Sequence, residues 1–369
     1  MSLCNFASIL LDAQFSSLSL CESLPRLLDA RDNKSTYGKE ELFEGLKQEA
    51  VAELSDLLIK LRQNPGRDPN HYMEFLKKAG ELRNRMAVKT ETSEAELFGS
   101  LRHEHNMISP LYAVRYKEVN EKIKQLILKC LKNIKNKEKG VRETRGVSRY
   151  TFRLETEEQC LLKNLAPIEK MQQTAKCRED YLSTGLHNRI DEVVYKLMVI
   201  DEYRSKIKPL EDVLTGLNEP ANSIFDKNIY VYSGVIELEV NKEWRTLTRH
   251  YTVISCDNKG IISQEHINRF KANGFVSLLH TSHEDFNFHA EPIAQLFDKI
   301  VDRETPKEQL YSLIRDFEYR LHHICYFKRG SAAINEMVLE AIQKVICPDY
   351  KIKGNLEALA EPFISLFMK

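Results

Sequence analysis

The amino-acid sequence predicts an α+β protein that is predominantly helical. We expect an N-terminal helical bundle over residues 1–220, followed by a domain over residues 221–369 in which helices pack on a small antiparallel sheet. Two observations lead to this prediction. Apolar residues recur at spacings of three and four over most of the first region, which is the period of an amphipathic helix. From about residue 224, two segments alternate apolar and polar residues as strands do.

The first region is expected to be helical almost throughout. Leucines recur at helical spacing over residues 42–61, and the pattern stops at residues 62–70, a turn cluster with two prolines and a glycine. The charged residues 132–149 predict a solvated helix end and loop, with a basic contact surface as the alternative. Breaks in the bundle are therefore expected near 62–70 and 136–150. Further helices are predicted at residues 71–87, 119–134, 157–182 and 187–207.

The second region is expected to combine a sheet with helices. Residues 228–240 and 244–256 alternate β-branched or aromatic side chains with polar ones, and the three residues between them predict a β-hairpin. A short helix that ends on Gly274 and a third strand at residues 275–280 follow. Helices are then predicted at residues 291–301, 305–327 and 331–346.

The composition indicates a folded protein in a reducing environment. Fifty-four basic residues balance 54 acidic ones, so the net charge does not favour nucleic acid as a partner. Eight cysteines are scattered without a C-x-x-C pair, which favours reduced thiols in a cytosolic compartment. No apolar run of about 18 residues predicts a transmembrane segment, and the N-terminus lacks the basic residues of a signal peptide. No glycine-rich phosphate loop precedes a helix.

Titratable residues are concentrated in residues 278–292, LLHTSHEDFNFHAEP. His280 ends the predicted third strand, and His283 and Glu284 follow in a predicted loop, a common place for catalytic groups. A histidine can move a proton near pH 7 while a carboxylate four residues away fixes its tautomer. The segment therefore predicts a catalytic cluster. The alternative is a polar strand end that faces solvent.

A metal site is a rival interpretation of the same segment. His289 and Glu291 resemble the H-A-E of zinc nucleobase deaminases, in which the histidine binds zinc and the glutamate shuttles protons. Those enzymes also need a P-C-x-x-C segment downstream, and this sequence has none. We therefore assign no metal ligand, and a hydrolase or deaminase-like reaction of the His/Glu cluster remains one alternative.

An anion site is predicted where the last long helix begins. Arg329 and Gly330 lead into Ser331, which is expected to cap that helix. An arginine beside the free N–H groups of a helix N-terminus suits a phosphate. Glu336, five residues further on, could return toward the histidine segment. A plain helix cap is the alternative interpretation.

Two resemblances add to these observations. Phe327 to Gly330 match the F-x-x-G of Fic-type AMP-transferases, although Cys325 stands at the position of their histidine. Residues 222–369 more closely resemble the LnaB-like AMP-transferring bacterial effectors, because Ser233 precedes a His-x-x-x-Glu pattern from His280 to Glu284. The latter resemblance implies that these three residues are catalytic. It also implies that His283, His289 and Glu291 are the second choices if the motif is read in another register.

The same resemblance implies a reaction, partners and a location. ATP would be the substrate, with Mg²⁺ as its companion ion, and AMP would pass to a host protein or a phosphorylated acceptor. Actin would be the activating partner, and the chain would be a secreted effector that acts in the host cytoplasm. Arg329 and the helix that begins at Ser331 could neutralise the phosphates. A non-catalytic helical protein that binds a host protein is the other alternative.

Overall fold

The computed structural model describes residues 39–63, 71–102, 108–110, 117–132, 141–156, 159, 192–193, 195–200, 203–204 and 228–369. The helices are α3 (Glu40–Gln63), α4 (His71–Lys89), η3 (Ala95–Leu97), α5 (Lys117–Lys132), α9 (Gln264–Asn273), α10 (His283–Val301), α11 (Lys307–Ile324), α12 (Ser331–Val345), α13 (Asn355–Ala360) and α14 (Ile364–Phe367). The strands are β1 (Ile108–Pro110), β2 (Val141–Arg145), β3 (Ser148–Thr156), β4 (Asn228–Val240), β5 (Glu243–Cys256) and β6 (Ser277–Leu279). None of the described helices is both long enough and apolar enough to cross a bilayer.

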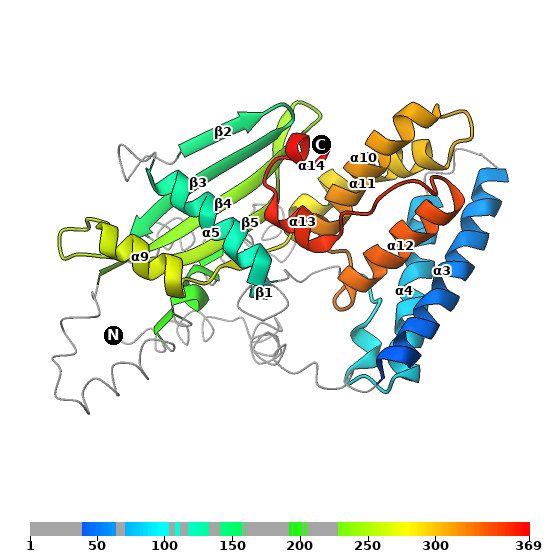
Figure 1. Cartoon of the computed structure of the whole chain (residues 1–369), viewed down its shortest axis with the longest axis horizontal. Helices are drawn as coiled ribbons and strands as arrows, with labels where there is room; N and C mark the ends of the chain where they lie inside the picture. The colour runs from blue at the N-terminus through cyan, green and yellow to red at the C-terminus, as the bar shows by residue number, and fades with distance from the viewer. Residues whose placement is uncertain are drawn as a thin grey trace, which may run out of the picture.

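The strands form one antiparallel sheet in the order β1-β6-β5-β4-β3-β2 (Figure 1). Its centre is the predicted hairpin, in which Val240 pairs with Glu243. The two residues between them, Asn241 and Lys242, have φ values of 52° and 68°. Two such residues in succession give the turn that matches the twist of paired strands. The α+β class and the small antiparallel sheet are therefore confirmed.

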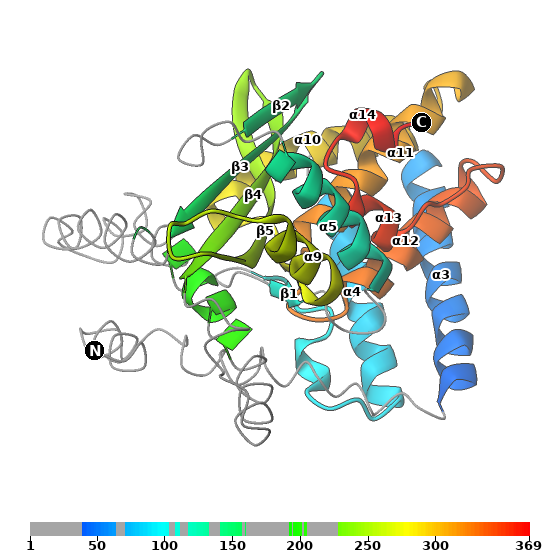
Figure 2. The ribbon, with the colours of Figure 1, turned by 60° about the vertical axis from the view of Figure 1, so that its left-hand side comes forward.

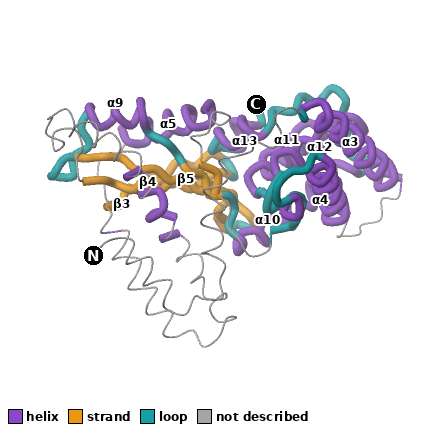
Figure 3. Tube along the Cα trace, turned by 90° about the horizontal axis from the view of Figure 1, so that it is seen from below, coloured by secondary structure: helices purple, strands orange, loops and turns teal. Residues whose placement is uncertain are grey.

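Side chains alternate across the sheet and so create two different faces. Tyr150, Phe152 and Tyr232 point into the main core, which α5 and α9 cover with residues such as Ile123 and Phe270. On the opposite face, the described helical residues between 192 and 204 pack on the sheet. Figure 3 shows the strands edge-on, with α5 and α9 on one side and this short helical segment on the other. Over β2, β3 and β4, this second face carries the pocket described below.

The helices α3, α4, α10, α11 and α12 pack beside the sheet (Figures 1 and 2). Aromatic rings join three of them. The ring centroid of Phe297 lies 5.1 Å from that of Phe75 and 6.1 Å from that of Phe317. All three side chains are fully buried, and each contributes about 1.5–3 kcal/mol through burial of apolar surface.

Two glycines permit a close contact at the end of this helical group. Gly80 lies within α4, and a Cβ atom added there would be 2.5 Å from the carbonyl oxygen of Gly99. Gly99 itself has a φ of 75°, a conformation that glycine adopts without strain. The segment after η3 can therefore lie directly on α4.

The structure corrects the first predicted region. Residues 141–156 form β2 and β3, whereas the sequence analysis places a solvated helix end and loop at residues 132–149. β3 lies beside β4 in the sheet, and one core extends from Leu46 to Phe367. The described parts on either side of residue 220 therefore pack together. The predicted helix at 157–182 lies almost entirely outside the described residues.

Candidate functional site

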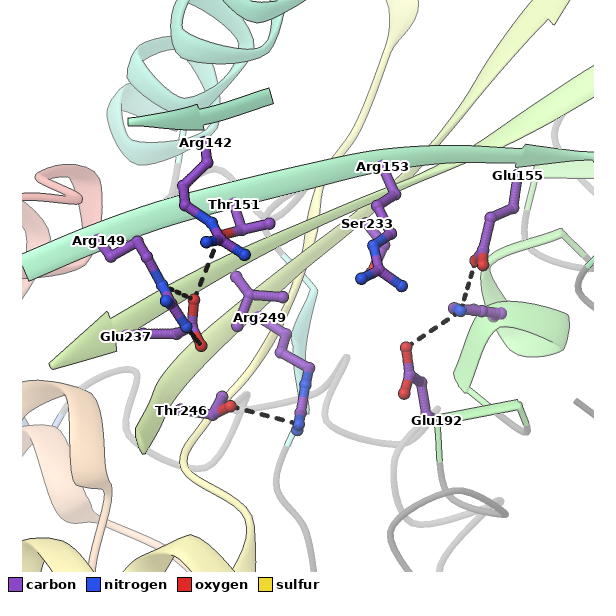
Figure 4. A pocket seen from close by; sticks show the side chains of 12 residues that line it. Arg142, Arg149, Thr151, Arg153, Glu155, Glu192, Ser233, Glu237, Thr246 and Arg249 are labelled. Carbon is purple, nitrogen blue, oxygen red and sulfur yellow. Dashed lines mark hydrogen bonds and ion pairs between the residues drawn. The ribbon is translucent and has the colours of Figure 1, made fainter. Parts of the chain in front are cut away.

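A pocket with a cavity volume of about 270 Å³ lies on the face of the sheet opposite to α5 and α9 (Figure 4). Five of its lining residues are basic and three are acidic, and Val235 is the one apolar residue among them. We call it the arginine pocket, and it is lined by Arg142, Arg149, Thr151, Arg153, Glu155, Glu192, Lys196, Ser233, Val235, Glu237, Thr246 and Arg249.

The pocket exists because short side chains lie between long ones within a row that crosses the strands. In one row, Arg142 of β2 pairs with Thr151 of β3, which pairs with Val235 of β4, which pairs with Arg249 of β5. Two short side chains thus lie between two long arginines and form a low floor. Ser233 extends this floor into the next row and is 6% exposed.

Two ion-paired groups form opposite walls of the pocket. Arg149 donates from Nε and Nη2 to the carboxylate of Glu237 at 2.7 and 2.5 Å. Lys196 lies with its Nζ 2.5 Å from Glu155 and 3.0 Å from Glu192. Burial acts to lower the pKa of Lys196, but the two carboxylates more than offset this, so its pKa lies above the usual value. The wall of Arg149 and Glu237 is neutral, and the wall of Lys196 with its two glutamates carries one net negative charge.

The remaining arginines supply the positive charge of the site. Arg142 and Arg153 are exposed, and neither forms an ion pair with a carboxylate in the described part of the chain. Arg153 pairs across the strands with Ser233. The Nη2 of Arg249 lies 3.5 Å from the hydroxyl of Thr246. Figure 4 shows these arginine side chains around the space in front of β4. Such an arrangement can bind an anion with several oxygens.

Two residues border the pocket without lining it. The ring of Trp244 lies 4.5 Å from the guanidinium carbon of Arg149 and so packs against the wall. Asp285, in the first turn of α10, accepts a hydrogen bond from Ser282 at 2.8 Å. Burial raises the pKa of Asp285, and the positive charge of Arg249 acts against this rise. A carboxyl group with a raised pKa therefore lies near the arginines.

The structure does not bring Ser233 and His280 together. Ser233 lies on the pocket face, whereas His280 donates from Nδ1 to the carbonyl oxygen of His323 at 3.1 Å. His323 in turn contacts Thr248, whose side chain points to the core face, at 2.8 Å. Burial, with a smaller effect of Arg102, lowers the pKa of His280 to about 4. His280 is therefore a neutral interior side chain on the opposite face of the sheet.

The other residues of the histidine segment lie in α10, which begins earlier than predicted and so includes His283 and Glu284 in place of the predicted loop. Ser282 caps α10, so that His283 and Glu284 form its first turn, and their side chains lie outside the described part. His289 is fully buried and bonds through Nε2 to the carbonyl oxygen of Thr246 at 2.9 Å. Glu291 is exposed and accepts a hydrogen bond from a neighbouring glutamine of the same helix.

The predicted anion site at α12 has different contacts from those expected. Gly330 and not Ser331 is the N-cap, and the Ser331 hydroxyl bonds to the backbone of Phe327. Arg329 forms an ion pair with Glu94 at 2.8 Å. Glu336 lies 3.5 Å from Lys47 of α3 and so faces away from the histidine segment. These four residues therefore contribute to packing between α12 and the helices beside it.

No group of three or more histidine, cysteine or acidic side chains suited to a metal ion occurs among the described residues. No protein-family model matches this chain, and no curated protein matches it. The arginine pocket is thus the feature of the described structure on which a functional proposal can rest.

The sequence analysis identified one residue of this pocket, Ser233, and missed the rest. A signal was present in residues 149–155, where arginine, threonine and glutamate alternate strictly with Tyr150, Phe152 and Leu154. That period of two predicts a strand with one charged face.

Proposed function

We propose that the protein is a nucleotidyltransferase that holds the phosphates of ATP in the arginine pocket and transfers AMP to an acceptor. The observation that supports this proposal is the position of Arg142, Arg153 and Arg249 around Ser233. Arg142 and Arg153 are exposed and form no ion pair with a carboxylate in the described part of the chain. Such guanidinium groups are suited to phosphate oxygens, which they can bind through two hydrogen bonds each. Arg249 is half-buried and interacts electrostatically with the carboxylates of Glu192, Asp285 and Glu237. The resemblance of residues 222–369 to AMP-transferring effectors supports the choice of ATP as the ligand.

The proposed reaction follows from the chemistry of a phosphoanhydride. An oxygen of the acceptor attacks the α-phosphorus of ATP, the bond from that phosphorus to the bridging oxygen breaks, and pyrophosphate leaves. The guanidinium groups would neutralise the charge that develops on pyrophosphate, and the hydroxyl of Ser233 would donate to a phosphate oxygen. Because His280 lies on the other face of the sheet, we assign acceptance of the acceptor's proton to Asp285.

The acceptor and the activator are also part of the proposal. The resemblance implies a host protein or a phosphorylated group as acceptor, actin as activator and the host cytoplasm as the location. Mg²⁺ would accompany ATP as its counterion.

Incubation with α-labelled ATP tests the transfer directly. We expect purified wild-type protein to label a protein in a eukaryotic cell extract, and Ser233→Ala and Arg153→Gln to lose most of this labelling. Arg269→Gln is the matched control, because Arg269 lies on α9 and pairs with Glu265 away from the pocket. Labelling that is equal in all four proteins would contradict the role of the pocket.

A phosphate-binding protein without catalytic activity is the second candidate. The interior positions of His280 and His289 favour it, because these histidines cannot act as acid or base on a ligand in the pocket. This candidate predicts ATP binding that depends on Arg153 and no transfer of label under any condition.

A further inference from the structure

We infer that the arginine pocket recognises a diphosphate or triphosphate chain and does not select the nucleobase attached to it. The inference rests on the proposed function, in that it takes the pocket to be a phosphate site. It goes further by naming the part of the ligand that is bound.

The spacing of the arginines fits an extended anion. Arg142 and Arg249 stand at the two ends of a row that crosses four adjacent strands. Neighbouring strands are about 4.8 Å apart, so the backbones of these two residues are separated by about 14 Å. In Figure 4 the Arg142 side chain extends toward Thr151, the Arg249 side chain extends toward Thr246, and Arg153 lies beside Ser233 in the next row. A chain of two or three phosphates can contact guanidinium groups along the whole row, whereas a single phosphate can contact both ends only where the two long side chains converge on it.

The charge of the pocket fits the same ligand. Arg149 is paired with Glu237, and Lys196 is paired with two glutamates, so the walls together carry one net negative charge. Arg142, Arg153 and Arg249 add three positive charges, and the five basic and three acidic lining residues therefore leave a net positive charge for the ligand. Each guanidinium group matches the geometry of phosphate oxygens, so a ligand with at least two phosphates can use all three. A single carboxylate has two oxygens and one negative charge, so it would leave part of this positive charge unused.

The described lining residues offer no stacking surface for a nucleobase. Proteins bind bases by stacking on aromatic or apolar groups and by hydrogen bonds to the ring edges. Among the described residues that line the pocket, none is aromatic and Val235 is the one apolar side chain. Trp244 lies behind Arg149 and so is outside the lining. At about 270 Å³ the cavity is also at the small end of ligand pockets, which range over about 300–1,000 Å³. The nucleoside would therefore extend out of the pocket.

Titration calorimetry with a series of ligands tests this inference. The ligands are tripolyphosphate, pyrophosphate, ATP, GTP, AMP and adenosine, all in one buffer with the same Mg²⁺ concentration. We expect tripolyphosphate, ATP and GTP to bind with affinities within about tenfold of one another, because each offers the same charge-assisted contacts. AMP is expected to bind at least about tenfold more weakly, since it loses at least one such contact, and adenosine is expected not to bind.

Three variants make the result specific to the pocket. Arg142→Gln and Arg153→Gln are each expected to weaken tripolyphosphate and ATP by at least about tenfold. Both side chains are exposed, so the fold should persist, and far-ultraviolet circular dichroism checks this. Arg269→Gln on α9 is the control that should bind like the wild type.

The possible failures differ from one another. If ATP binds through Arg153 but GTP binds more than about tenfold more weakly and tripolyphosphate does not compete, the proposed function stands and a base-selective site replaces this inference. If no phosphate ligand binds, both the inference and the proposed function are wrong. Equal binding by the wild type and the two pocket variants would place the phosphate site elsewhere. This result would contradict the inference and the proposed function.

Discussion

Acidification from pH 7 to pH 5 is expected to remove a large part of the protein's stability, because five histidines lie uncharged in its interior. Burial lowers the pKa of His280 and His289 to about 4 and that of His250 and His322 to about 3. Burial also lowers the pKa of His323 well below its usual value. All five side chains are at most 5% exposed. Protonation of any of them would place a charge in the core.

The sign and size of the effect follow from linkage. Each folded-state pKa lies below the unfolded value of about 6.5, so the unfolded chain binds more protons and stability falls as the pH decreases through 6.5 toward the folded value. At pH 5 each histidine is about 1.5 pH units below its unfolded pKa, which corresponds to a loss of about 2 kcal/mol. The four histidines with a pKa of about 3 or 4 together lose about 8 kcal/mol, which lies within the ~5–15 kcal/mol that stabilises a typical domain.

Urea unfolding followed by circular dichroism at pH 7, 6 and 5 measures this loss. The variant His289→Gln isolates one contribution. Its amide can still donate to the carbonyl oxygen of Thr246, 2.9 Å from Nε2 in the wild type, but it cannot titrate. Its free energy of unfolding should therefore fall about 2 kcal/mol less than that of the wild type between pH 7 and pH 5. A wild-type change smaller than about 1 kcal/mol over this range would refute the reasoning.

Two further predictions concern side chains outside the pocket. Glu318 is fully buried and accepts hydrogen bonds from the Arg315 side chain and from the backbone N–H of Gly354, each at 2.7 Å. Glu318→Ala should lower the free energy of unfolding in urea by about 3–5 kcal/mol, because a buried charged network loses its centre; a loss below about 1 kcal/mol would contradict this. Gly80→Ala should lower the melting temperature because its Cβ would meet the backbone, whereas Gly45→Ala in α3 has open space and should raise it. Equal shifts for the two alanines would show that the close contact is unimportant.

Most of the fold could be predicted from local patterns. Helical spacing of leucines identified α3, and strict alternation identified the hairpin of β4 and β5. β2 and β3 were missed because their outer faces carry arginine and glutamate, which resemble a charged helix end when composition alone is considered. The alternation of Tyr150, Phe152 and Leu154 is the signal that distinguishes the two interpretations.

The site could be predicted only in part, because it is assembled from residues that are distant in sequence. Arg142, Ser233 and Arg249 come together through the register of four strands, which no local pattern reveals. The density of histidines near residue 280 suggested an exposed cluster. A strand of three residues does not fix which face the following side chain takes, and His280 turns into the core.

The central claim is that the arginine pocket binds phosphate, and titration with ATP followed by tryptophan fluorescence tests it most directly. Trp244 is the one tryptophan of the chain and lies against Arg149 in the pocket wall. We predict a saturable fluorescence change in the wild type that weakens as salt is added. In the Arg142→Gln/Arg153→Gln double variant, the affinity should fall by at least about tenfold. An affinity that is unchanged in the double variant, or no binding by the wild type, would contradict the account.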